Sequence, residues 1–258
     1  MLSKARKKLI SAMVQKKMRD QHHLFLAEGP KMIADLIEFG LIPRFLVGTD
    51  QWQPPVKVKQ SEIETIILPE DEFKKLSLLK TPQHVLGLFT KPEYYLNNNA
   101  IFDSLALALD GIQDPGNMGT IVRLADWFGI AHIICSKDTV DIFNPKVVQA
   151  SMGAVAKVQV HYADLPSFCE EYTSRTGNPV YGAFMNGKNL FNHPLKPKGL
   201  IVMGNEGNGI RPDTEKQITE KITIPDFSQS GKISESLNVG VATAIICAEF
   251  RRQCSLGT

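Results

Sequence analysis

Three clusters of glycine and polar side chains follow predicted strands and hold the residue types that could do chemistry. The first cluster, residues 110–130, contains Asn117 and Arg123. Asn117 is placed to cap a helix, and Arg123 would lie about six residues further along it. An arginine there can bind a phosphate or a carboxylate through two parallel hydrogen bonds. The alternative is a surface arginine beside an ordinary helix start.

The other two clusters have the features of ligand-binding loops. Residues 200–212 form an apolar strand that runs into three glycines, and Glu206 is the only acid in the loop. Glycine permits positive φ and the close approach of a ligand. Residues 222–245 include Ser236-Leu237-Asn238, which would open a helix whose free N–H groups face the same sheet edge. Each loop alone could be a turn, but three at one edge of a sheet predict a ligand site.

Several common signatures are missing from the sequence. It has no GxGxxG after the first strand and no GxSxG, and Ser230-Gly231-Lys232 lacks the upstream glycine of a P-loop. The four cysteines, Cys135, Cys169, Cys247 and Cys254, include no CxxC pair, and the six histidines form no HxxxH pattern. We therefore expect buried thiols and no metal site.

The elements that must position these clusters alternate between strand and helix from residue 101 onward. We predict strands at 105–109, 130–135, 158–162, 180–184, 200–203 and 222–224, and helices at 116–128, 145–152, 166–174 and 236–252. The apolar run 105–109 is typical of a strand covered on both faces. This alternation predicts an α/β domain with a mainly parallel sheet.

The first ~90 residues predict a smaller mixed α/β domain. We expect strands at 44–48, 63–68 and 85–89, a short apolar run at 24–26, and helices at 30–39 and 69–79. The stretch KPEYYLNNNA, residues 91–100, lacks periodicity and indicates a linker. The predicted division is a domain at 1–91, a linker at 92–100 and a second domain at 101–258.

Composition limits the class of protein. A chain of 258 residues with 43% hydrophobic residues suffices for two domains without disulfide or metal support. No apolar run approaches the ~18 residues of a membrane span. The N-terminal apolar stretch is too short for a signal peptide, so we expect a cytoplasmic protein without a membrane partner. Residues 1–20 hold seven lysines and arginines against Asp20, which is either a solvated helix face or a contact for a phosphate backbone.

The motifs in order resemble a known family. NMGTIVRLADWFG, MGNEGNGI and IP…SESLNVGVATAI closely resemble the three motifs of the SpoU/TrmH branch of SPOUT RNA methyltransferases. FNPKVVQASMGAV at 143–155 resembles a fourth family stretch. FLAEGPKMIADLI at 25–37 and KTPQHVLGLF at 80–89 resemble the RNA substrate-binding domain that precedes many of these enzymes. The resemblance covers nearly the whole chain.

This resemblance implies an S-adenosylmethionine-dependent RNA 2′-O-ribose methyltransferase. The second domain would be an α/β SPOUT domain with a trefoil knot, working as a homodimer. The implied cofactor-binding residues are Phe184, Gly204, Ile224 and Leu237, and the implied catalytic residues are Asn117, Arg123, Glu206, Ser236 and Asn238. Arg123 would contact the phosphate and the developing alkoxide, because arginine resists deprotonation. Gly240 and Gln149 depart from the residues that the family often has.

Three activities remain open from the sequence. The RNA-binding front domain favours large-subunit rRNA as the substrate, with tRNA as the alternative. A non-catalytic RNA-binding protein would be expected to have lost one of the implied catalytic residues. A base methyltransferase of a neighbouring branch is disfavoured by the NxGTIxR pattern.

Overall fold

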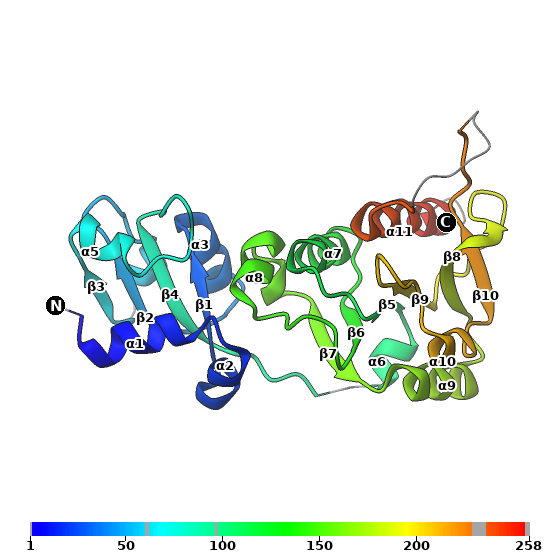
Figure 1. The fold of residues 1–258 in the computed structure, drawn as a ribbon, viewed down its shortest axis with the longest axis horizontal. Helices are drawn as coiled ribbons and strands as arrows, with labels where there is room; N and C mark the ends of the chain where they lie inside the picture. Colours follow the sequence, from blue (N-terminus) through cyan, green and yellow to red (C-terminus); the bar gives the residue numbers. More distant parts are fainter. Residues whose placement is uncertain (1, 60–61, 96–97, 229–235, 256–258) are drawn as a thin grey trace. The chain divides into compact units, whose positions relative to one another are not determined.

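The computed structural model describes residues 2–59, 62–95, 98–228 and 236–255, which form two compact units. The first unit comprises residues 1–93 and 141–157, and the second comprises residues 94–140 and 158–258. The Ser230-Gly231-Lys232 triplet lies outside the described residues. Each unit has its own sheet (Figure 1). Each also has its own apolar core.

The first unit is built on a four-stranded sheet with the order β1-β4-β2-β3. β4 pairs antiparallel with β1 and β2, and β3 joins β2 in parallel. The strands are β1 (Leu24–Glu28), β2 (Pro43–Gly48), β3 (Thr65–Ile67) and β4 (Val85–Thr90). The helices are α1 (Lys4–Ala12), α2 (Lys16–His22), α3 (Pro30–Glu38), α4 (Val56–Lys59), α5 (Glu70–Lys74) and α8 (Pro145–Ser151), followed by the 3-10 helix η1 (Ala154–Ala156). The strands and helices predicted for this region are present, although α5 is shorter than expected.

The basic N-terminus is part of the core of the first unit. Ile10 and Met13 are fully buried and pack with the β1 residues Leu24 and Leu26. The side chains of successive strand residues point to opposite faces, so Phe25 faces the other side of the sheet. Residues 1–20 therefore do more than present a solvated face.

The segment 141–157 lies in the sequence stretch predicted for the second domain, yet it packs with the first unit, where α8 contacts β1. Phe143 packs against Phe25 with ring centroids 4.9 Å apart. Arg19 donates to the Asp141 carboxylate at 2.6 Å, and both side chains are buried. Periodicity along the chain could not reveal this, because a short amphipathic helix does not indicate which sheet it covers.

The second unit contains a six-stranded sheet with the order β10-β8-β9-β5-β6-β7, and all its pairings are parallel. The strands are β5 (Leu105–Asp110), β6 (His132–Ser136), β7 (Gln159–Ala163), β8 (Val180–Asn189), β9 (Gly199–Gly204) and β10 (Glu220–Thr223). β5 and β9 lie in the middle of the sheet, and every residue of β5 is buried. The predicted α/β class and parallel sheet are confirmed.

Helices cover both faces of this sheet. They are α6 (Asn98–Phe102), α7 (Pro115–Trp127), α9 (Leu165–Thr176), α10 (Pro212–Glu215) and α11 (Val239–Ser255). Within the unit, α7 and α11 lie side by side on one face, and α6, α9 and α10 lie on the other (Figure 1). Among the described residues, no helix is long and apolar enough to cross a membrane.

Three of the four cysteines are buried in this unit, as expected. Burial raises the pKa of the Cys169 and Cys247 thiols to about 12. These thiols are therefore protonated and unreactive near neutral pH.

Candidate functional site

The predicted clusters meet at one edge of the six-stranded sheet. β5 and β9 are parallel neighbours in register, with Asp110 opposite Gly204, so both strands end at the same edge. The turn after β5 (residues 111–114) leads into α7, and the loop after β9, which we call the β9 loop (residues 205–211), leads into α10. The turn 236–238 before α11 also reaches this place.

A chain of side-chain hydrogen bonds joins the three clusters. Asn117 donates from Nδ2 to Glu206 Oε1 at 2.6 Å. Asn238 donates from its own Nδ2 to Asn117 Oδ1 at 2.9 Å. Asn117 thus uses both ends of its amide to bridge the β9 loop and the start of α11. Three of the five implied catalytic residues are in direct contact.

The start of α7 corrects one prediction. Asn117 does not cap this helix, because the cap is Asp114, whose carboxylate accepts the Asn117 N–H at 2.7 Å. Pro115 occupies the first helical position, where its fixed φ and missing N–H are favourable. The cap therefore lies three residues before the expected one, and the helix begins one residue before its expected start. This start places the Asn117 side chain within the first turn, where it is available to the neighbouring loops.

Asn238 caps α11 with its side-chain oxygen. Its Oδ1 accepts from Gly240 N at 2.9 Å and from Val241 N at 3.2 Å, while its Nδ2 is bonded to Asn117. Gly240, one of the departures from the family pattern, lies where α11 packs on α7. A Cβ added there would be 3.2 Å from Thr120 Cγ2. A larger residue there would push against α7.

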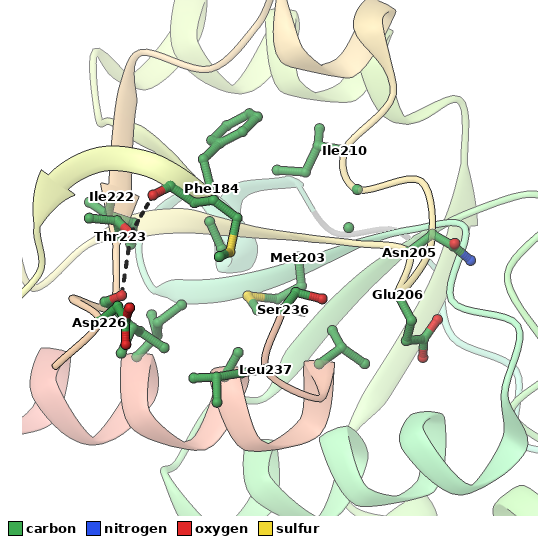
Figure 2. A pocket seen from close by; sticks show the side chains of 18 of the residues that line it. Phe184, Met203, Asn205, Glu206, Ile210, Ile222, Thr223, Asp226, Ser236 and Leu237 are labelled. Carbon is green, nitrogen blue, oxygen red and sulfur yellow. Dashed lines mark hydrogen bonds between the residues drawn. The ribbon is translucent and has the colours of Figure 1, made fainter. Parts of the chain in front are cut away.

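A cavity of about 700 Å³ lies beside this chain of bonds. Figure 2 shows Phe184, Met203, Ile210 and Leu237 around it, with Glu206 at one side. Its lining includes all four implied cofactor-binding residues and also Glu206 and Ser236. Segments from β8, the β9 loop, the end of β10 and α11 form its walls, and all of them belong to the second unit. A volume in the range of about 300–1,000 Å³ is typical of small-molecule sites.

Two glycines are required by the geometry of the β9 loop. An added Cβ on Gly204 would lie 2.3 Å from the Gly209 carbonyl carbon, so no side chain fits there. Gly209 has φ +69° and open space beside it. Asn205 and Gly209 pair through their backbone groups at 3.0 and 2.9 Å, which closes the loop on itself. The loop therefore presents main chain to the cavity.

Arg123 is not among the residues brought together. It is exposed on α7, does not line the cavity and makes no side-chain hydrogen bond or ion pair within the described residues. Thr120 and Trp127 are exposed on the same helix at helical spacing from it. Its guanidinium is therefore available to an external anion.

Sequence reasoning missed three residues that shape the site. Asn205 donates from Nδ2 to the Gly111 carbonyl at 2.8 Å, and its Oδ1 accepts from Gly207 N and Asn208 N. Asp110 is fully buried and binds Arg211. A charged residue at the end of the otherwise apolar run LALALD was the available signal, because a buried carboxylate requires a partner.

Ionisation at this edge follows these contacts. Hydrogen bonding to Asp110 raises the pKa of Arg211. The Ser136 hydroxyl and the nearby Arg211 lower the pKa of Asp138. At the cavity, the Ser228 backbone and hydroxyl lower the pKa of Asp226. These side chains are charged near neutral pH.

The residues of the cavity fit S-adenosylmethionine. The apolar side chains of Phe184, Ile210 and Leu237 can pack against the adenine base and the methylene groups beside the sulfonium, and the glycine-rich β9 loop offers main-chain groups at close range. Glu206 and Asp226 supply acceptors for hydroxyl and ammonium groups.

Comparisons with known proteins identify the family of the chain. The sequence pattern of the SpoU rRNA Methylase family matches residues 104–248, and that of the MRM3-like substrate binding domain matches residues 4–87. The chain is 30% identical over 237 residues to the 23S rRNA (guanosine(2553)-2′-O)-methyltransferase RlmP of Bacillus subtilis, covering 92% of each chain.

Two solved structures resemble the whole chain. A protein of the TrmH family from Porphyromonas gingivalis is 39% identical with a TM-score of 0.82, over 98% of this chain and 99% of that one. The AdoMet-bound rRNA methyltransferase from Sinorhizobium meliloti is 27% identical with a TM-score of 0.82, over 98% of this chain and 97% of that one. The chain therefore belongs to the SpoU rRNA methylase family, which uses S-adenosylmethionine as the methyl donor.

Proposed function

We propose that this protein transfers a methyl group from S-adenosylmethionine to a ribose 2′-hydroxyl of large-subunit ribosomal RNA. The observation that carries the proposal is the hydrogen-bonded chain Asn238–Asn117–Glu206 at the edge of the cavity. The similarity to RlmP and the match of residues 4–87 to a substrate-binding domain favour ribosomal RNA over tRNA.

The protein's own residues would act mainly by positioning the substrate and by electrostatic stabilisation. S-adenosylmethionine supplies a methyl group on a positively charged sulfur. Arg123 would hold the phosphate next to the target ribose and stabilise negative charge that develops on the 2′-oxygen. The proton of the hydroxyl would leave to solvent, because a guanidinium cannot accept it.

Asn117 has a supporting role in this scheme. Its amide is held at both ends by Glu206 and Asn238, so its orientation is fixed before RNA binds. Glu206, Ser236 and Leu237 then shape the wall of the cavity. A fixed set of polar groups lowers the barrier because little reorganisation remains to be done during the reaction.

We also propose that the protein forms a homodimer through α7 and α11. α11 carries a row of small and apolar residues that are exposed or half-buried, at helical spacing: Val241, Ala244, Ile245 and Ala248. On α7, the Trp127 side chain is 82% exposed. Burying this face against a second copy would remove it from water and cover the region around Arg123.

Two further parts of the proposal concern the fold and the location. A trefoil knot in the second unit is proposed from the resemblance of its motifs to the SpoU/TrmH branch. A reducing, cytoplasmic location is supported by the four free cysteines.

The test is methyl transfer to RNA. The purified protein is incubated with labelled S-adenosylmethionine and undermethylated total RNA, and the 2′-O-methyl positions are mapped. We expect labelling of large-subunit rRNA. Labelling of tRNA alone would show that the substrate is tRNA and not ribosomal RNA. Cofactor binding without transfer to any RNA would favour a non-catalytic RNA-binding protein. Absence of both cofactor binding and transfer would overturn the enzyme proposal.

A further inference from the structure

The β9 loop lines the cavity, and its two ends are hydrogen-bonded to the end of β5 and to the turn that follows it. Residues Asn205 to Ile210 all line the cavity. We propose that Asn205 and Arg211 are positioning residues, which hold the β9 loop in the shape that binds the cofactor. This inference rests on the proposed function, and it assigns roles to two residues for which the family resemblance implied none.

The first fastening is made by Asn205. Its Nδ2 donates to the Gly111 carbonyl at 2.8 Å, and its Oδ1 accepts from Gly207 N at 2.9 Å and Asn208 N at 3.1 Å. One side chain therefore ties the turn after β5 to two amides inside the loop. The backbone pair between Asn205 and Gly209 closes the same segment. Gly207 and Asn208 are thus held through their main-chain amides.

The second fastening is the ion pair between Arg211 and Asp110. Arg211 donates to the Asp110 carboxylate from its backbone N at 2.9 Å, from Nε at 2.7 Å and from Nη2. Asp110 is fully buried, so a displaced Arg211 would leave a carboxylate without its partner. Arg211 also reaches Asp138 at 3.2 Å, which extends the contact to the loop after β6. The planar guanidinium fork suits two carboxylates at once, and an ammonium does not.

These fastenings connect the cavity to the reacting end of the site. The residues that bind Arg211 and Asn205, Asp110 and Gly111, lead through the Asp114 cap into α7, which carries Asn117. Glu206 follows Asn205 directly and is bonded to Asn117. Fixing residues 205 and 211 against residues 110 and 111 therefore fixes Glu206 relative to Asn117. Loosening either end should weaken cofactor binding first.

The sharpest variant is Asn205→Asp. The carboxylate keeps an oxygen for Gly207 N and Asn208 N, but its second oxygen faces the Gly111 carbonyl and repels it. Asn192→Asp is the control, because it adds the same charge at an exposed position outside the cavity. Two quantities are measured on the full chain: the Kd for S-adenosylmethionine by calorimetry, and amide hydrogen exchange of residues 207–211 without cofactor.

For Asn205→Asp we expect the cofactor Kd and the exchange rate to rise at least tenfold, with the KM for RNA within about twofold. A Kd and an exchange rate within twofold of the parent protein would overturn the inference. If the parent protein binds no cofactor, the proposed function fails, whereas the exchange comparison still reports on the loop.

Arg211→Lys provides a second test if Asn205→Asp does not fold. It keeps a positive charge near Asp110 but loses the fork that bridges Asp110 and Asp138. We expect faster exchange of the loop and a weaker cofactor Kd, both by roughly fivefold or more. Lys216→Ala, which breaks only the exposed pair with Asp213, should change neither. Equal behaviour of the two variants would contradict a positioning role for Arg211.

Discussion

Replacing Arg123 with alanine should separate activity from stability. Arg123 is exposed and has no side-chain partner within the described residues. Its loss should therefore change the free energy of unfolding by no more than about 0.5 kcal/mol. Removing a charged group from a developing oxyanion costs about 2.7–4 kcal/mol, which corresponds to a 10²–10³-fold lower kcat. The effect on catalysis should thus exceed the effect on folding several-fold.

Three measurements on the Arg123→Ala protein test this expectation. Single-turnover methyl transfer gives the rate, calorimetry gives the Kd for S-adenosylmethionine, and urea unfolding gives the stability. The Kd should stay within a few-fold of the parent value, because Arg123 does not line the cavity. Arg175→Ala is the control for the rate and for the Kd, since Arg175 is an exposed arginine on α9 that contacts Glu171 and Phe102 and does not line the cavity.

Two results would refute the reasoning about Arg123. An unchanged rate would remove Arg123 from the reaction. A cofactor Kd that rises more than tenfold would instead assign it to the cofactor site. Arg123→Lys adds a further check, because a lysine keeps the charge but cannot bind a phosphate through two parallel hydrogen bonds. Its methyl-transfer rate should lie between those of the parent protein and Arg123→Ala.

Four other predictions follow from the contacts described. Asn117→Asp replaces the donor to Glu206 with an acid, and the loss of about 1.5–3 kcal/mol should lower kcat at saturating cofactor and RNA at least tenfold. Lys4, Lys8 and Lys17 are exposed without a side-chain partner in the described residues. Changing them to glutamine should reduce the slope of RNA affinity against salt concentration, and an unchanged slope would assign them to a solvated face. Arg19→Met should cost about 3–5 kcal/mol in urea unfolding, and the double variant with Asp141→Leu should recover much of it. Burial lowers the pKa values of His132 and His161, so the unfolded chain binds more protons than the folded one below pH 6.5. The free energy of unfolding should therefore fall as the pH drops below that value. His161→Phe should make this pH dependence shallower in unfolding experiments from pH 7.5 to 5.

The sequence predicted the second unit well because its signals are local. An apolar run such as LALAL identifies a strand that is covered on both faces, and the parallel arrangement follows from the alternation with helices. The same reasoning predicted that the Asn117, Glu206 and Asn238 segments meet, since parallel strands share one carboxyl edge. The side-chain pairing itself could not be predicted, because it depends on rotamers and on helix starts that differ from the predicted ones by one residue in α7 and three in α11.

The missed features depend on contacts between distant parts of the chain. Arg211 is 101 residues from Asp110, and no spacing rule connects them. The Asn117 cap was misplaced because Asp114 and Asn117 are both good capping residues, and Pro115 decides between them. The short helices α4, α6 and α10 have too few residues to show a period. Packing, more than local propensity, determines these parts.

The first unit is discontinuous in sequence, and this has a consequence for how the protein is made. Its sheet is complete by residue 93, but α8, the Arg19–Asp141 ion pair and the Phe25–Phe143 contact arrive only with residues 141–157. At the usual pace of synthesis, of about 5–20 residues per second, these residues follow roughly 3–13 s later. During that interval the nascent sheet exposes the apolar surface that α8 will cover, and Arg19 has no carboxylate partner from that segment. Chaperone contact during translation, and the failure of chimaeras joined at the linker, are the expected signs of this delay.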